Sequence, residues 1–162
     1  MKTIFSIIIF IPIFSLGQLN TKHYTKKQEV KGLQSYIDSS MFTVESEIES
    51  LIDKKNINND KLEKLFQKQS KLNLALNYTK KAKRRLKFGN IVSLATASSA
   101  FIGFQLANRP SVGFIDLSEI YLASAGILII VGQSINVPLK ISAKQKIQKG
   151  KELIKEINSL YK

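Results

Sequence analysis

Apolar residues are distributed along this chain in two patterns. In the first they form nearly continuous runs, at Ile4–Phe14, Phe88–Ala107 and Leu117–Val137. In the second they recur every three or four residues between polar positions, in residues 30–51, 62–76 and 147–161. Long apolar runs are typical of segments in lipid, and the three-to-four spacing is typical of helices with one buried face. We therefore expect an all-α membrane protein.

The two longer runs predict a transmembrane helical hairpin over residues 88–137. Each would form a helix roughly 30 Å long, the thickness of a bilayer's hydrocarbon core. Their only charged residue is Glu119, near the start of the second run. The segment between them favours a reversal, because Arg109 precedes a proline. Asp116 and Glu119 have the spacing of a helix-capping box, and the alternative is that Glu119 is a functional carboxylate within the membrane.

Small residues recur every four positions in the first run and predict the surface on which the two spans pack. They are Ala95, Ser99, Gly103 and Ala107. Small side chains let helix backbones approach closely, which favours association in lipid. In an antiparallel hairpin, Gly126 of the second run would lie near Ser99. Gln105 and Gln133 fall near opposite faces of the bilayer, within reach of water or a partner.

Residues 28–87 predict an extramembrane antiparallel helical pair of coiled-coil type. The first helix carries a heptad stripe of Val30, Leu33, Ile37, Met41, Val44, Ile48 and Leu51. The second carries Leu62, Leu65, Leu72 and Leu76, with Phe66 widening its apolar face. Between them, Asn56–Asp60 is rich in residues that favour turns and helix caps. This segment therefore predicts the reversal of the pair.

The two helices of this pair carry charges of opposite sign. Residues 38–53 hold five acids and no base, whereas residues 61–87 hold ten bases and one acid. A folded pair would bring Glu49 close to Lys61 or Lys64, although exposed pairs contribute only some tenths of a kcal/mol. Charge would then select the pairing and the apolar stripes would hold it. The alternative is that both sets of charges are simply solvated.

The first 17 residues have the layout of a secretory signal peptide. Lys2 precedes the apolar run, and small residues stand at Ser15 and Gly17 before Gln18. This segment resembles bacterial leaders that end in Ser-Leu-Gly-Gln, which implies cleavage after Gly17. The competing interpretation is an uncleaved anchor helix. Residues 18–27 follow as a polar linker that contains the only histidine, His23.

Basic residues flank the predicted hairpin on both sides, in a chain of net charge +13. Before it stand Lys80, Lys81, Lys83, Arg84, Arg85 and Lys87. Because this cluster adjoins an apolar span, we expect it to contact anionic lipid headgroups rather than nucleic acid. Residues 138–162 carry seven lysines against two acids and predict a basic amphipathic C-terminal helix. That helix would lie on the membrane surface or pack on the other soluble helices.

Two topology signals conflict in this sequence. The positive-inside rule places both basic flanks of the hairpin in the cytoplasm. A cleaved signal peptide places them outside it, and the two spans that follow do not remove the mismatch. We favour the signal peptide, since its three-part layout is a positive signal for translocation. We therefore expect a bacterial inner-membrane protein whose extramembrane parts lie on the periplasmic side.

Candidate chemistry is sparse in this composition. The chain has no cysteine and one histidine, so we expect no metal site, no cofactor and no enzymatic activity. The sequence favours a membrane-anchored structural or interaction protein that presents a charged helical module. Its partner would be another protein or a second copy, through the heptad helices. The alternatives are a small pore-forming protein of holin or toxin type, and an accessory transporter subunit using Gln105, Glu119 and Gln133.

Overall fold

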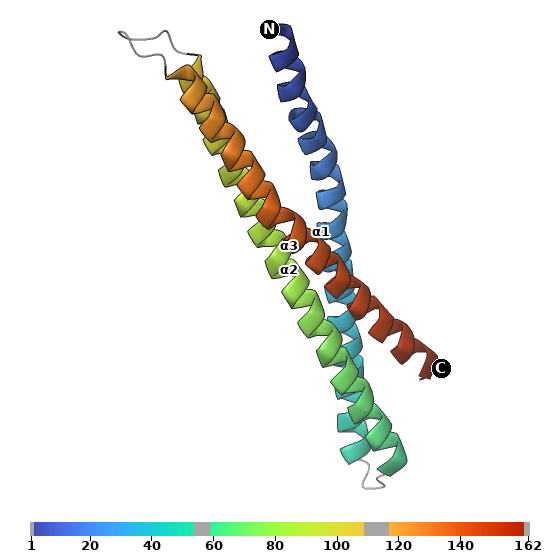
Figure 1. The fold of residues 1–162 in the computed structure, drawn as a ribbon. Coiled ribbons are helices and arrows are strands. Elements are labelled where there is room, and N and C mark those ends of the chain that lie inside the picture. Colours follow the sequence, from blue (N-terminus) through green and yellow to red (C-terminus); the bar gives the residue numbers. More distant parts are fainter. Residues whose placement is uncertain (1, 54–58, 109–116, 161–162) are drawn as a thin grey trace. The chain divides into compact units, whose positions relative to one another are not determined.

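The computed structural model describes residues 2–53, 59–108 and 117–160, with side chains described from Lys26 onward. These residues form three long helices: α1 (Lys2–Asp53), α2 (Asn59–Ala107) and α3 (Ser118–Leu160) (Figure 1). The all-α prediction is confirmed for the described residues. Both α2 and α3 are long and apolar enough to cross a membrane. Of the predicted turn Asn56–Asp60, the last two residues begin α2, and residues 56–58 lie outside the described residues. The loop at residues 109–116, with the capping residue Asp116, also lies outside them.

The chain divides into two compact units. Residues 1–79 and 150–162 form the first, which we call the three-helix unit, and residues 80–149 form the second, the hairpin unit. Helices α2 and α3 each contribute one segment to both units, whereas α1 belongs to the three-helix unit alone.

The core of the three-helix unit confirms the predicted stripes of α1 and α2. Its fully buried members include Ile37, Val44 and Leu72, and Leu33, Met41, Leu62 and Leu76 pack around them half-buried. These are heptad positions, which face a neighbouring helix because 3.5 residues nearly complete a turn. Phe66 lies outside this face, since 49% of it is exposed. Ala75 and Thr79, also fully buried, extend the stripe of α2 toward the hairpin unit.

The predicted pair contains a third helix, which is the main difference from the sequence interpretation. Ile157 of α3 belongs to the buried core, and Leu153 and Ile154 pack against it. The C-terminal segment is therefore packed on the other helices and is not a separate element after Pro138, because α3 continues through that proline. Gly150 permits this packing: a Cβ there would lie 3.3 Å from Leu33 and 3.5 Å from the Thr79 hydroxyl.

Polar contacts tie α3 to both of the other helices in this unit. The Tyr36 hydroxyl donates a hydrogen bond of 3.0 Å to Asn158. Lys71 of α2 forms an ion pair of 2.7 Å with Glu156, and Lys151 pairs with Glu29 of α1. These groups are partly exposed, so each pair contributes about 0–1 kcal/mol and mainly selects the arrangement of the helices.

Helix α1 also differs from its predicted limits. It starts at Lys2, so residues 18–27, predicted as a linker, are helical. The side chains of this stretch up to residue 25, including His23, lie outside the described part. An uninterrupted helix is compatible with either interpretation of residues 1–17, because signal peptides and anchors are both apolar and helix-forming.

Candidate membrane interface

The hairpin unit is built on a seam between α2 and α3 in which residues alternate at spacings of three and four. On α2 the seam residues, all buried or half-buried, are Ala82, Leu86, Gly89, Ser93, Thr96, Ala100, Gly103 and Ala107. On α3 they are Leu122, Ala125, Ile129, Gly132, Asn136, Leu139 and Ala143. This is coiled-coil spacing, which holds one stripe of each helix against its neighbour. Most of the seam residues in the apolar part of α2 are small.

Three glycines permit close approach of the helices along the seam. A Cβ on Gly132 would lie 2.1 Å from the Thr96 hydroxyl oxygen, so the Thr96 side chain occupies the space above that glycine. A Cβ on Gly103 would lie 3.1 Å from that of Ala125, and one on Gly89 would lie 2.8 Å from the Asn136 amide. The helices pack backbone to side chain at these levels, as is typical of helix association in lipid.

Asn136 is the most buried polar residue of the hairpin unit, with 2% of its surface exposed. When its amide is oriented so that both of its atoms have partners, the nitrogen donates to the Gly89 carbonyl at 3.3 Å. The oxygen then accepts from the Ser93 hydroxyl and from Lys140 at 3.2 Å. A buried polar group of this kind sets helix register, because any shift leaves it without partners.

The surface on which the two spans were predicted to pack, made of small residues four positions apart, differs from the observed seam. Gly103 and Ala107 lie in the seam, but Ala95 and Ser99 are exposed. A step of four residues turns a helix by about 400°, so a four-residue ridge drifts about 40° per step away from a straight contact line. The expected pairing of Ser99 with Gly126 is also absent, since a Cβ on Gly126 would meet no described atom within 4 Å. Ala125, its neighbour, makes the contact instead.

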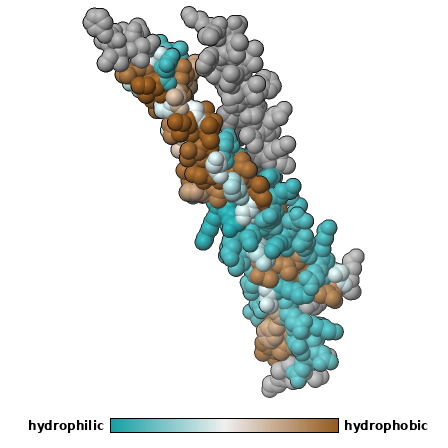
Figure 2. Space-filling model, in the orientation of Figure 1, coloured by the Kyte–Doolittle hydropathy of each residue, from teal (hydrophilic) through white to brown (hydrophobic). Residues whose placement is uncertain are grey.

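Large apolar side chains cover the outside of the hairpin, whereas the α2 side of the seam is made mostly of small residues. Leu94 is 71% exposed and Ile130 is 67% exposed. Others that are exposed include Phe88, Ile91, Phe101, Ile102, Ile120, Ile127, Val131 and Ile135. In the most apolar stretch of α2 no residue is buried, and in that of α3 only 17% are. Figure 2 shows this surface as brown along the two helices.

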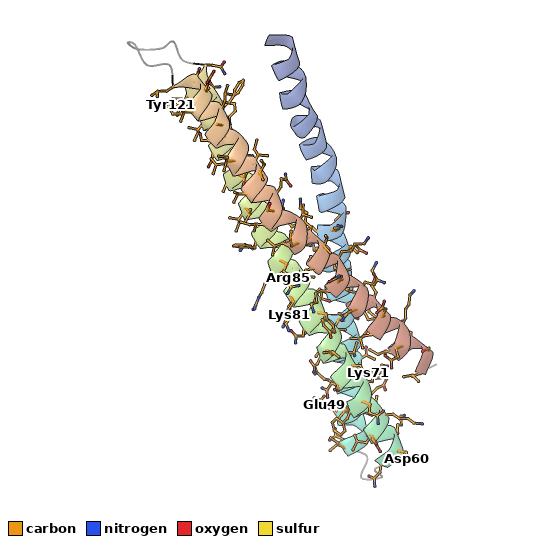
Figure 3. The ribbon with its side chains drawn as sticks, in the orientation of Figure 1. Glu49, Asp60, Lys71, Lys81, Arg85 and Tyr121 are labelled. Atoms are coloured by element: carbon orange, nitrogen blue, oxygen red, sulfur yellow. The ribbon has the colours of Figure 1, made fainter. Side chains whose placement is uncertain are left out.

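A ring of bases, which we call the basic collar, stands at the end of the hairpin unit away from its loop. Lys80, Lys81, Lys83, Arg84 and Lys87 are exposed on α2, and Arg85 is half-buried. Figure 3 labels Lys81 and Arg85 on this helix. The antiparallel α3 adds Lys140, Lys144, Lys146 and Lys149. No acid occurs in residues 80–108 or 120–149. The collar therefore gathers ten bases at the end where the apolar surface stops.

The remaining polar candidates do not converge on one site in a single chain. Gln105, Gln133 and Glu119 are all exposed, and Glu119 lies in the first turn of α3. Within residues 26–53, 59–108 and 117–160 there is no cluster of His, Asp and Glu that could hold a metal ion. Asn136, which sequence reasoning missed, is the polar residue that the fold places at the centre of a network.

Comparison with protein-family models, with curated proteins and with solved structures found no match to this chain.

Proposed function

We propose that this protein is a membrane-anchored interaction protein whose α2–α3 hairpin spans a bilayer and whose three-helix unit lies at the membrane surface. The observation that carries the proposal is the inverted burial of the hairpin. Small residues make up the α2 side of its seam from Gly89 to Ala107, while Leu94, Phe101 and Ile130 face outward. Burying such a side chain is worth about 1.5–3 kcal/mol in water, so a soluble hairpin would bury them. Lipid removes that requirement.

The basic collar supports a surface position for the end of the hairpin. Bases beside an anionic bilayer contribute about 1 kcal/mol each, and long side chains can reach the headgroups from helix ends. Lys81 and Lys87 are exposed on α2, and Lys144 is exposed on α3. Both helices thus carry charge at one end of the apolar surface, as expected where a hairpin enters and leaves lipid.

The three-helix unit supplies the interaction surface in this proposal. Its α1 helix exposes Glu45, Glu47 and Glu49, and beside them Phe42 is 75% exposed. An acidic face with a protruding aromatic side chain suits a basic protein partner or the basic segments of a second copy. A pore would require several hairpins, since the space between α2 and α3 is filled at Gly132 and Gly103.

Labelling of single cysteines tests the membrane position directly, because the chain has no native cysteine. Ser99→Cys lies on the exposed surface midway along the apolar part of α2, and Ser70→Cys lies on the exposed surface of the three-helix unit. In membrane fragments that are accessible from both faces and free of detergent, we expect a water-soluble maleimide to label the Ser70→Cys variant and to spare the Ser99→Cys variant. The reason is that a thiol in lipid does not form the reactive thiolate. Detergent should make both reactive. Equal labelling before detergent would overturn the proposal.

The side of the membrane is tested through the amino terminus. The segment Ser15-Leu16-Gly17 before Gln18 motivates cleavage, and we propose a periplasmic three-helix unit on that basis. Intact-mass measurement of the protein extracted from bacterial membranes should give a chain that begins at Gln18. A mass that retains residues 1–17 would instead indicate an anchor helix, and the basic collar would then favour the cytoplasmic side.

A further inference from the structure

Pro138 lies inside α3, next to the basic collar. A proline has no N–H, so the carbonyl of Ser134, four residues earlier, has no helical hydrogen-bond donor. A shallow groove, open to the surroundings over most of its volume of about 430 Å³, lies at this position and is lined by Arg85 of α2 and by Ser134, Ile135, Pro138, Leu139 and Ser142 of α3. All of these residues belong to the hairpin unit. The groove therefore brings one cation, hydroxyl groups and an apolar wall together.

The polar side of the groove suits a phosphate group. Arg85 is the one member of the cluster at residues 80–87 that is half-buried, while the other five bases are exposed. Its planar guanidinium can donate two parallel hydrogen bonds to phosphate oxygens, which a lysine cannot. The Ser134 hydroxyl already donates to the Ile130 carbonyl at 2.9 Å. Ser142, which is half-buried, is the other hydroxyl-bearing residue that lines the groove with Arg85.

The other side of the groove is apolar. Ile135, Pro138 and Leu139 line it, and Ile135 continues into the exposed apolar surface of α3. A free phosphate ion would gain nothing from these side chains, whereas a phospholipid has a phosphate and an acyl chain in the same order. The surrounding collar bases, Lys140 and Lys144 among them, favour a lipid with net negative charge.

We propose that this groove binds one anionic phospholipid, with its phosphate on the Arg85 guanidinium and the Ser142 hydroxyl and its acyl chain along Ile135 and Leu139. This inference rests on the proposed membrane insertion of the hairpin. It adds a defined lipid site to the diffuse attraction that the collar exerts on any anionic surface.

Native mass spectrometry of the full chain in detergent tests the site with phosphatidylglycerol as the probe. We expect one tightly bound lipid per chain, and at least about tenfold weaker binding for Arg85→Gln, since a charged hydrogen-bonding group is lost. Arg84→Gln removes the same charge from an exposed collar position and should weaken binding far less than Arg85→Gln does, because it removes only diffuse attraction. Arg85→Lys should fall between them, because it keeps charge and loses the bidentate geometry. Circular dichroism should show equal helicity in all four proteins.

Three further results separate the possible failures. Equal weakening by Arg84→Gln and Arg85→Gln would overturn the groove and leave only collar attraction. If millimolar inorganic phosphate displaces the bound phosphatidylglycerol as effectively as added lipid does, the proposal that the ligand is a lipid would be overturned. Flotation of the parent and of both glutamine variants with liposomes at alkaline pH tests insertion separately. If the parent and both glutamine variants float but bind phosphatidylglycerol equally well, the proposed lipid site is wrong and the proposed membrane insertion stands. If the parent does not float, the proposed membrane insertion is wrong.

Discussion

Replacing Gly132 with leucine should open the α2–α3 hairpin. Its Cβ would lie 2.1 Å from the Thr96 hydroxyl oxygen and 2.8 Å from the Thr96 Cβ. The Thr96 side chain also donates to the Val92 carbonyl at 2.8 Å, so rotating it away loses a hydrogen bond in an apolar site. Overpacking of this kind costs about 3 kcal/mol. Denaturation of the detergent-solubilised protein by increasing SDS, followed by circular dichroism, should show a clear loss of stability.

Gly126→Leu is the matched control for this change. It makes the same substitution six residues earlier on α3, with the same gain in helix propensity, and a Cβ there would meet no described atom within 4 Å. We expect unchanged or slightly increased stability in SDS. If both variants weaken the hairpin equally, the seam through Gly132 is not the contact line.

Ile37→Lys should unfold the three-helix unit. Ile37 is fully buried in a core to which all three helices contribute. A lysine there would leave a charge without a partner among apolar side chains and remove the packing of the isoleucine. The expected loss is about 3–5 kcal/mol, a large part of the stability of a small unit. Trypsin should then cut the many lysines of α2 within this unit, while the hairpin in the detergent micelle stays protected.

Ser39→Lys provides the comparison for Ile37→Lys. It adds the same charge two residues later on the exposed side of α1. Its stability and its trypsin pattern should match the parent within about 0.5 kcal/mol. Equal sensitivity of the two variants would show that α1 does not bury this stripe.

The stripes of the three-helix unit can be predicted from the sequence because a helix with one buried face places large apolar side chains there at regular spacing. Ile37, Val44 and Leu72 stand at heptad positions between polar residues, and all three are fully buried. The third helix cannot be predicted in the same way. An amphipathic basic segment has one pattern whether it lies on a membrane or against other helices, so Ile157 gives no indication of its neighbour.

In the hairpin the usual signal is weak, since large apolar residues occur on several faces of both helices. If the hairpin lies in lipid as proposed, lipid accepts the large side chains and packing selects the small ones, but small residues occur all around the apolar part of α2. Ala95, Ser99 and Gly103 are equally small, and only Gly103 lies in the seam. Asn136 becomes informative once the three-and-four spacing of the seam is known, because that spacing passes through Gly132, Asn136 and Leu139. Asn136 is then recognisable as a polar residue at a position that the seam buries.

The contribution of α3 to the three-helix unit has a consequence for biosynthesis. The hydrogen bond from Tyr36 to Asn158 can form only after a further 122 residues have been synthesised. At about 5–20 residues per second, the ribosome needs on the order of ten seconds to supply it. In a chain inserted as we propose, both spans must cross the bilayer before residues 150–160 return to the side of α1. In a chain that inserted only one span, residues 150–160 would remain on the opposite side from α1. The three-helix unit would then stay incomplete, with its apolar core exposed. Such misinserted chains would be open to degradation.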